Sequence, residues 1–144
     1  MLQSDQNDPF DLQRFITAQN RVIDQVRAEL NAGRKTSHWM WFIFPQLRGL
    51  GYSETANYYG ISGLDEAIAY LADPVLGPRL IECVQILNAY EGRTAQQIFG
   101  YPDWLKFHSS MTLFHRAAPD SPAFRDALKK FFNGEEDSAT TQHL

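Results

Sequence analysis

The stretch TSHWMWFIFPQLRGLG, residues 36–51, decides the fold class of this 144-residue chain. It holds two of the three tryptophans and one of the four histidines, with few polar residues between them. As a strand it would need partner strands for its backbone groups, and no stretch of the chain shows sustained two-residue alternation with hairpin turns. As a helix from a Ser37 cap to a stop at Pro45, its backbone groups find partners locally. We therefore expect a short, buried, central aromatic helix.

The rest of the chain also shows helical patterns. The first long helix is expected to begin with Asp8 as its cap and Pro9 at its first position, and to end at Gly33. Four further helices are expected over residues 62–73, 73–92, 101–117 and 121–134, and the first, second and last of these are capped by Ser62, Asp73 and Ser121. Short helical turns are expected at 53–60, with a helix start at Ser53, and at 94–100, where Thr94 and Gln97 have capping-box spacing. The tail 135–144 is either one more turn or frayed. The predicted fold class is all-α, with about five longer helices and short helical turns.

The composition is that of an ordinary globular domain. Hydrophobic residues make up 44% of the chain and charged residues 21%, and a chain of this length buries enough surface to fold without disulfides. We expect one compact domain over residues 1–144, with its core from about 8 to 137. The formal net charge of -4 and the pI near 5.5 exclude a general nucleic-acid binder, which needs a clearly basic face.

The N-terminal sequence MLQSDQNDPF has neither the basic nor the apolar region of a secretory signal, so we expect a cytoplasmic protein. The longest apolar run, residues 39–44, is far shorter than the roughly 20 residues that span a bilayer, which predicts no membrane span. Cys83 is the one cysteine and lies in the apolar pattern LIECVQIL. It is predicted to be a small buried hydrophobic residue rather than a reactive thiol.

Metal and cofactor chemistry has little support in the sequence. His108 and His115 are seven residues apart, so about 10.5 Å of helical rise separates them and one ion cannot bind both. The sequence contains no H-E-x-x-H, C-x-x-C, Walker or G-x-S-x-G motif. We therefore predict no metal site and no cofactor such as haem or flavin.

The helix expected at 101–117 has two different faces. Helical spacing places the apolar side chains Trp104, Phe107, Met111 and Phe114 on one side, with His108 and His115 at its edge. The opposite side carries Lys106, Ser109, Ser110 and Leu113. Two interpretations of that side stay open: a solvated face, or a surface where the serines allow close approach of a ligand and Lys106 donates to a phosphate or carboxylate.

The aromatic motif itself also has two interpretations. It can be pure core, with the tryptophans filling volume, or it can form a stacking wall in which His38 and Gln46 supply polar contacts. Under the second interpretation the candidate ligand-binding residues are His38, Trp39, Trp41, Gln46, Lys106, Ser109 and Ser110. The function expected is then a pocket that binds a small anionic or nucleotide-like ligand of the ADP-ribose or NAD type; the alternative is a non-catalytic structural or protein-interaction module.

Several motifs in order carry a family resemblance: SHWMWFIFPQLRGLGYS, then YGI, LADPVLGPRL and DWLKFHSSMTLF. They resemble the bacterial domain-of-unknown-function family 1810, some members of which carry the label calpastatin. The resemblance extends from about Asp8 to Asp137 and implies a compact all-helical domain. It implies no established activity, so no catalytic residues follow from it.

A fainter likeness is to the NADAR-type N-glycosidases, small helical domains that act on ADP-ribosyl or related ribosyl linkages. The order of Ser37-His38, a proline-containing helix, and Asp103-Trp104 followed by Met111 loosely parallels that family. Ser37 stands where the acid of that family would fall, and glycosidic cleavage generally uses a carboxylate. If the resemblance extends to an N-glycosidase-like activity, Asp103 is the nearest candidate for the acid; the alternative is that the fold has kept the pocket and lost the reaction.

Overall fold

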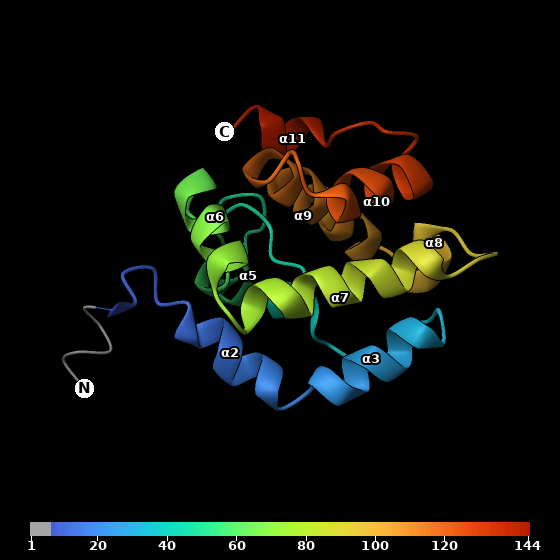
Figure 1. Cartoon of the computed structure of the whole chain (residues 1–144), viewed down its shortest axis with the longest axis horizontal. Helices are drawn as coiled ribbons and strands as arrows, with labels where there is room; N and C mark the ends of the chain where they lie inside the picture. Colours follow the sequence, from blue (N-terminus) through green and yellow to red (C-terminus); the bar gives the residue numbers. More distant parts are fainter. Residues whose placement is uncertain (1–6) are drawn as a thin grey trace.

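The fold is shown by a computed structural model that describes residues 7–144. These residues form ten helices (Figure 1): α2 (Gln13–Asn20), α3 (Ile23–Asn31), α4 (Met40–Ile43), α5 (Glu54–Tyr58), α6 (Leu64–Ala72), α7 (Leu76–Ala89), α8 (Ala95–Phe99), α9 (Asp103–Ala117), α10 (Pro122–Phe132) and α11 (Ser138–Thr141). The described part contains no strand, only an isolated parallel bridge between Leu47 and Ile61. The predicted all-α fold class is confirmed.

Two long helices organise the packing. Figure 1 shows α7 across the middle of the molecule, with α3 along one side and α10 along the other, and α3, α6 and α10 all pack against it. Helix α9 packs against α6, α8, α10 and α11. None of the helices in residues 7–144 is long and apolar enough to cross a membrane.

Helix α9 is buried on nearly all sides. Every residue from Ser109 to Phe114 is buried, and Ser110 is 0% exposed. The interpretation of the serine face as solvated is therefore wrong, because neighbouring helices cover it. Cys83 on α7 is 1% exposed, and burial raises the pKa of its thiol to about 12, which confirms that it is a buried hydrophobic residue.

Several local predictions are confirmed by the helix caps. The side chain of Ser53 accepts a hydrogen bond from the Ala56 amide at 3.0 Å at the start of α5. Thr94 and Gln97 form the predicted capping box of α8. Asp73 accepts hydrogen bonds from the amides of the next helix start, Val75 and Leu76. These caps need only residues a few positions apart, so a short motif predicts them.

The first long helix differs from the prediction. Asp8 does accept hydrogen bonds from backbone amides, but from Leu12 and Gln13, so Pro9 lies in a turn before α2 rather than at a first helical position. The predicted single helix up to Gly33 is also interrupted between α2 and α3. The two halves have different partners, since α2 packs on α4 and α3 packs on α7, and a straight helix would not reach both.

The aromatic helix is shorter than predicted. Helix α4 is a single turn, and Ser37 lies before it without capping it. The Ser37 hydroxyl instead donates to the carboxylate of Glu29 at 2.6 Å. Ser62 differs from the prediction for a similar reason, because its hydroxyl donates to Glu66 at 2.8 Å rather than accepting from the start of α6. In both cases a carboxylate competes for the hydroxyl.

The carboxylate of Glu29 fixes the chain that leads into α4. Glu29 lies on α3 and is 5% exposed. It accepts five hydrogen bonds of 2.6 to 3.1 Å, from the amides of Thr36 and Ser37, the hydroxyl of Ser37, the indole of Trp39 and the side chain of Gln25. A buried carboxylate is stable only when its oxygens are paired in this way. Burial acts to raise the pKa of Glu29, but hydrogen bonds, led by that from Ser37, outweigh it and lower the pKa to about 2.

A pH titration of stability tests this role of Glu29. Since the folded-state pKa of about 2 lies below the ordinary value of 4.5, the stabilisation is present above pH 4.5 and is lost as the pH falls toward 2. We expect Glu29→Gln to lower the free energy of unfolding by about 3 kcal/mol at pH 7, and by much less near pH 2. Urea denaturation at several pH values measures this. A loss that does not depend on pH would contradict the assignment, and Glu91→Gln, at an exposed carboxylate, is the control.

A second buried charge holds α2, α5 and α6 together. Arg14 forms an ion pair with Glu66 at 2.9 Å, and both side chains are less than 5% exposed. The remaining guanidinium hydrogen bonds reach backbone carbonyls of Phe10, Asp11, Tyr58 and Gly60. This arginine is saturated with partners and is therefore structural.

Removal of this arginine should destabilise the protein strongly. We expect Arg14→Met to lower the free energy of unfolding by about 3–5 kcal/mol, because it leaves the buried Glu66 carboxylate without its cation and with hydrogen bonds from Ser62 alone. The matched control is Arg21→Met, an exposed arginine just after the same helix, which should change stability little. Equal effects of the two substitutions in thermal denaturation would contradict the buried-pair assignment.

Candidate functional site

Two of the predicted ligand-binding residues meet at the surface between α4 and α9. The ammonium group of Lys106, at the end of the first turn of α9, lies 4.9 Å from the centre of the Trp41 ring on α4. Both side chains are partly exposed. A lysine over an indole face is a favourable cation–π contact, and here it joins residues that are 65 positions apart in the sequence.

A buried ion pair lies beside this contact. Asp103, at the start of α9, binds Lys35 at 2.7 Å and Lys106 at 3.7 Å. Lys35 is 7% exposed, and its ammonium group lies 5.0 Å from the Trp39 ring. The order in space is therefore Trp39, Lys35, Asp103, Lys106, Trp41: an aromatic ring, a cation, an anion, a cation and a second ring. Two cations around one carboxylate leave a local charge of +1.

The other residues predicted in the aromatic motif have different positions. Trp39 is 0% exposed and donates its indole N–H to Glu29, so it belongs to the core. His38 is exposed and Gln46 is half-buried. The backbone carbonyl of Gln46 accepts from Ile61 at 2.9 Å, which ties this part of the motif to the segment before α6. Trp41 is thus the tryptophan of the motif that reaches the surface.

The two predicted serines do not join Trp41 and Lys106. The Ser109 hydroxyl is hydrogen-bonded to Asp137 at 2.7 Å, beside the start of α11. Ser110 is fully buried, and its hydroxyl has no hydrogen-bond partner among the described residues. Ser109 therefore has a structural partner, and Ser110 is out of reach of a ligand in solution.

Neither carboxylate near the aromatic motif is free. Glu29 is adjacent to Ser37 but uses its oxygens for five hydrogen bonds. Asp103 is shared by two lysines. Among residues 7–144, no group of three histidine, cysteine, aspartate or glutamate side chains comes together in a way that would hold a metal ion. The arrangement offers a ring and a charge for binding rather than a set of acid and base groups.

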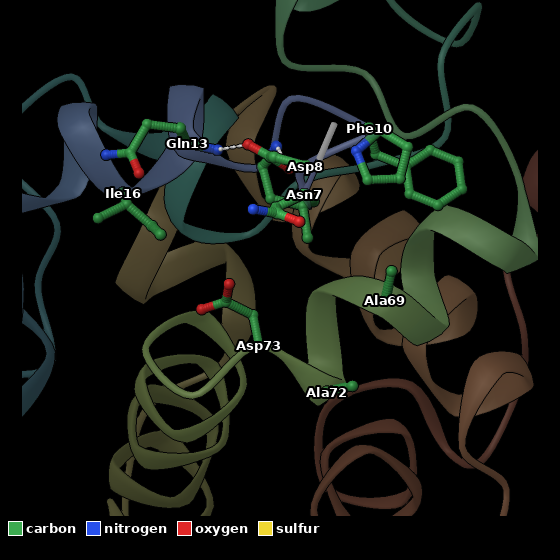
Figure 2. Close-up of a pocket in the computed structure, with 10 residues that line it drawn as sticks. Asn7, Asp8, Phe10, Gln13, Ile16, Ala69, Ala72 and Asp73 are labelled. Carbon is green, nitrogen blue, oxygen red and sulfur yellow. Dashed lines mark hydrogen bonds between the residues drawn. The ribbon is translucent and has the colours of Figure 1, made fainter. Parts of the chain in front are cut away.

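Surface hollows occur elsewhere on the molecule. Five hollows of about 380 to 470 Å³ lie among the described residues, and neither Trp41 nor Lys106 lines any of them. Figure 2 shows one of about 410 Å³, with Asn7 and Asp8 on one side and Asp73 on the other. The carboxylates of Asp8 and Asp73 each accept hydrogen bonds from two backbone amides near a helix start. This hollow therefore offers few polar groups that are free to bind a ligand.

Sequence reasoning missed two members of the surface cluster as binding residues. Lys35 is visible in the sequence only as a basic residue before the aromatic motif, and Asp103 only as the candidate acid under the fainter family resemblance. Their ion pair joins segments 68 positions apart, which no local pattern reveals. One signal was available: no acidic residue occurs between Glu29 and Glu54, which favours a partner for Lys35 from a more distant part of the chain.

The comparisons with known proteins place the chain in a family. The family described as a protein of unknown function, DUF1810, matches residues 9–144. A crystal structure of a conserved hypothetical protein from Mycobacterium tuberculosis is 55% identical in sequence, covers 95% of this chain and 98% of its own, and has a TM-score of 0.94. No curated protein matches, and the likeness to NADAR-type N-glycosidases receives no support from these comparisons. The chain belongs to the DUF1810 family of proteins of unknown function.

Proposed function

We propose that this protein binds a small anionic ligand that carries a planar ring, such as a nucleotide of the ADP-ribose or NAD type, at the surface formed by Trp41 and Lys106. The observation that carries the proposal is the 4.9 Å contact between the Lys106 ammonium and the Trp41 ring. It puts a stacking surface and a positive charge side by side. These are the two groups that a nucleotide-like ligand needs for its ring and its phosphate.

The surroundings of Lys106 also support this proposal. Its contact with Asp103 at 3.7 Å is long for an ion pair, whereas Lys35 holds the same carboxylate at 2.7 Å. Since Lys35 already pairs with Asp103, the charge of Lys106 is only partly neutralised. An incoming phosphate can therefore attract Lys106 away from the Trp41 ring. The partly buried Asp103 keeps Lys35 as its ion-pair partner when Lys106 moves.

A non-catalytic interaction module is the second candidate function. It is favoured by the burial of Trp39, Ser109 and Ser110, which removes three of the predicted ligand contacts from solvent. Under this alternative the Trp41–Lys106 contact only stabilises the packing of α4 on α9. We assign no catalytic residue in either case, because Asp103, the nearest carboxylate, is engaged by two lysines.

Tryptophan fluorescence and thermal shift test the binding proposal. ADP-ribose, NAD, mononucleotides and sugar phosphates are titrated onto the whole protein. A ligand at 100 times its dissociation constant should add about 2.7 kcal/mol to the free energy of unfolding, and stacking on Trp41 should quench its emission. We expect Lys106→Met to weaken binding at least about tenfold, since one charge-assisted contact contributes about 1.5–3 kcal/mol.

The structure supplies a matched control for this substitution. Lys130 also lies over an aromatic ring, with its ammonium group 5.7 Å from the centre of Phe131, but on α10. Lys130→Met should leave binding unchanged, and Trp41→Phe should remove the quenching. If no compound of the panel shifts the melting temperature, or if Lys106→Met binds as well as the wild type, the interaction module is the better account.

A further inference from the structure

A second charged feature lies at the other end of α9. A hollow of about 390 Å³ is lined by residues of α9, of α10 and of the segment that follows α10. Its charged and polar lining residues are His115, Arg116, Arg125, Lys129 and Glu136. Three permanent cations and a histidine thus face one hollow, in a chain whose formal net charge is -4. The hollow is independent of the Trp41–Lys106 surface, since Lys106 and His115 are about 13.5 Å apart along the helix axis.

The positions of these cations follow from the helices that carry them. Arg125 and Lys129 are four residues apart on α10, so they lie one above the other on the same face. Arg116 lies in the last turn of α9, and Lys129 in the last turn of α10. The negative end of a helix dipole favours cations at these positions. This attraction offsets part of the repulsion between the like charges around the hollow.

Several donors in the hollow have no internal partner. Arg116 donates its Nε and Nη2 groups to Glu136 at 2.6 and 2.8 Å, and its Nη1 group makes no hydrogen bond with residues 7–144. Arg125 has only a 3.4 Å contact with its neighbour Asp126. Lys129 makes no hydrogen bond or ion pair within the described part of the chain. The hollow therefore has donors available to a ligand.

Glu136 orients Arg116 and leaves the hollow positive. The hydrogen bond from Arg116, together with the charge of the same guanidinium, outweighs burial and lowers the pKa of Glu136 below its ordinary value. The carboxylate therefore stays ionised and holds the guanidinium plane in place. One more polar group is unused, because His115 Nδ1 is buried at this wall without a hydrogen-bond partner among the described residues. Glu136 and Asp126 offset two of the three permanent cations, so the net positive charge around the hollow is small and local.

We propose that this hollow binds a small phosphate-class dianion, with Arg125 and Lys129 as its principal contacts and Arg116 as a third. The fixed fork of an arginine matches two oxygens of a phosphate, and a lysine adds a mobile point charge. The volume suits a small molecule rather than a polymer. The acidic balance of the whole chain also disfavours an extended polyanion.

Titration of inorganic phosphate, followed by NMR of the backbone amides, tests this proposal. We expect saturable chemical-shift changes at residues 115–116, 125–129 and 134–136, beyond those produced by sodium chloride at equal ionic strength. The double variant Arg125→Gln, Lys129→Gln should bind at least about tenfold more weakly, because it loses two charge-assisted contacts. Both side chains are exposed, so the fold should persist and the dispersion of the spectrum verifies it.

Two controls separate a site from a general charge effect. Arg34→Gln with Arg93→Gln removes the same charge from exposed positions outside the hollow and should leave binding intact. The exchange Arg125→Lys with Lys129→Arg keeps the charge and should retain most of the affinity. The proposal is overturned if the shifts do not saturate at tens of millimolar phosphate, if sodium chloride reproduces them, or if the two double glutamine variants bind equally.

Discussion

The buried carboxylate of Glu29 is the interaction on which the surface around α4 depends. An ionised group with 5% exposure must find its donors close by, and four of the five come from residues 36–39. Those hydrogen bonds fix the path of the chain before α4 and draw the Trp39 indole into the core. Because Trp39 is held inside, Trp41 two residues later reaches the surface beside α9. The position of the exposed ring thus follows from a charge on α3.

Helix α9 explains why candidate sites occur at its ends rather than along its length. Its middle is covered by α6, α10 and α11, so polar side chains there serve the packing. Ser109 and Thr112 both hydrogen-bond to Asp137, which holds the C-terminal segment in place. Only near its first and last turns does α9 present charged side chains to solvent, with Lys106 near one end and Arg116 near the other.

The sequence predicts a structural feature well when the residues that form it lie close together along the chain. The caps at Ser53 and Thr94 need partners three residues away, and they were predicted correctly. Ser37 was predicted as a cap, but Glu29 competes for its hydroxyl from another helix. The same reasoning applies to the sites. The sequence identified Lys106 and Trp41 as separate candidates, but the ion pair between Lys35 and Asp103 and the grouping of Arg116 with Arg125 require the tertiary fold.

The charge distribution restricts the class of ligand that the two proposed sites, at Lys106 and beside Arg125, would accept. At physiological ionic strength, interactions between exposed charges are screened beyond about 8 Å. A small anion at Lys106, or in the hollow beside Arg125, therefore senses mainly the adjacent cations and not the net charge of -4. A longer polyanion would extend beyond these cations, and the acidic balance of the whole chain disfavours its binding. Both proposed sites therefore favour compact anions, because only these remain within reach of the local cations.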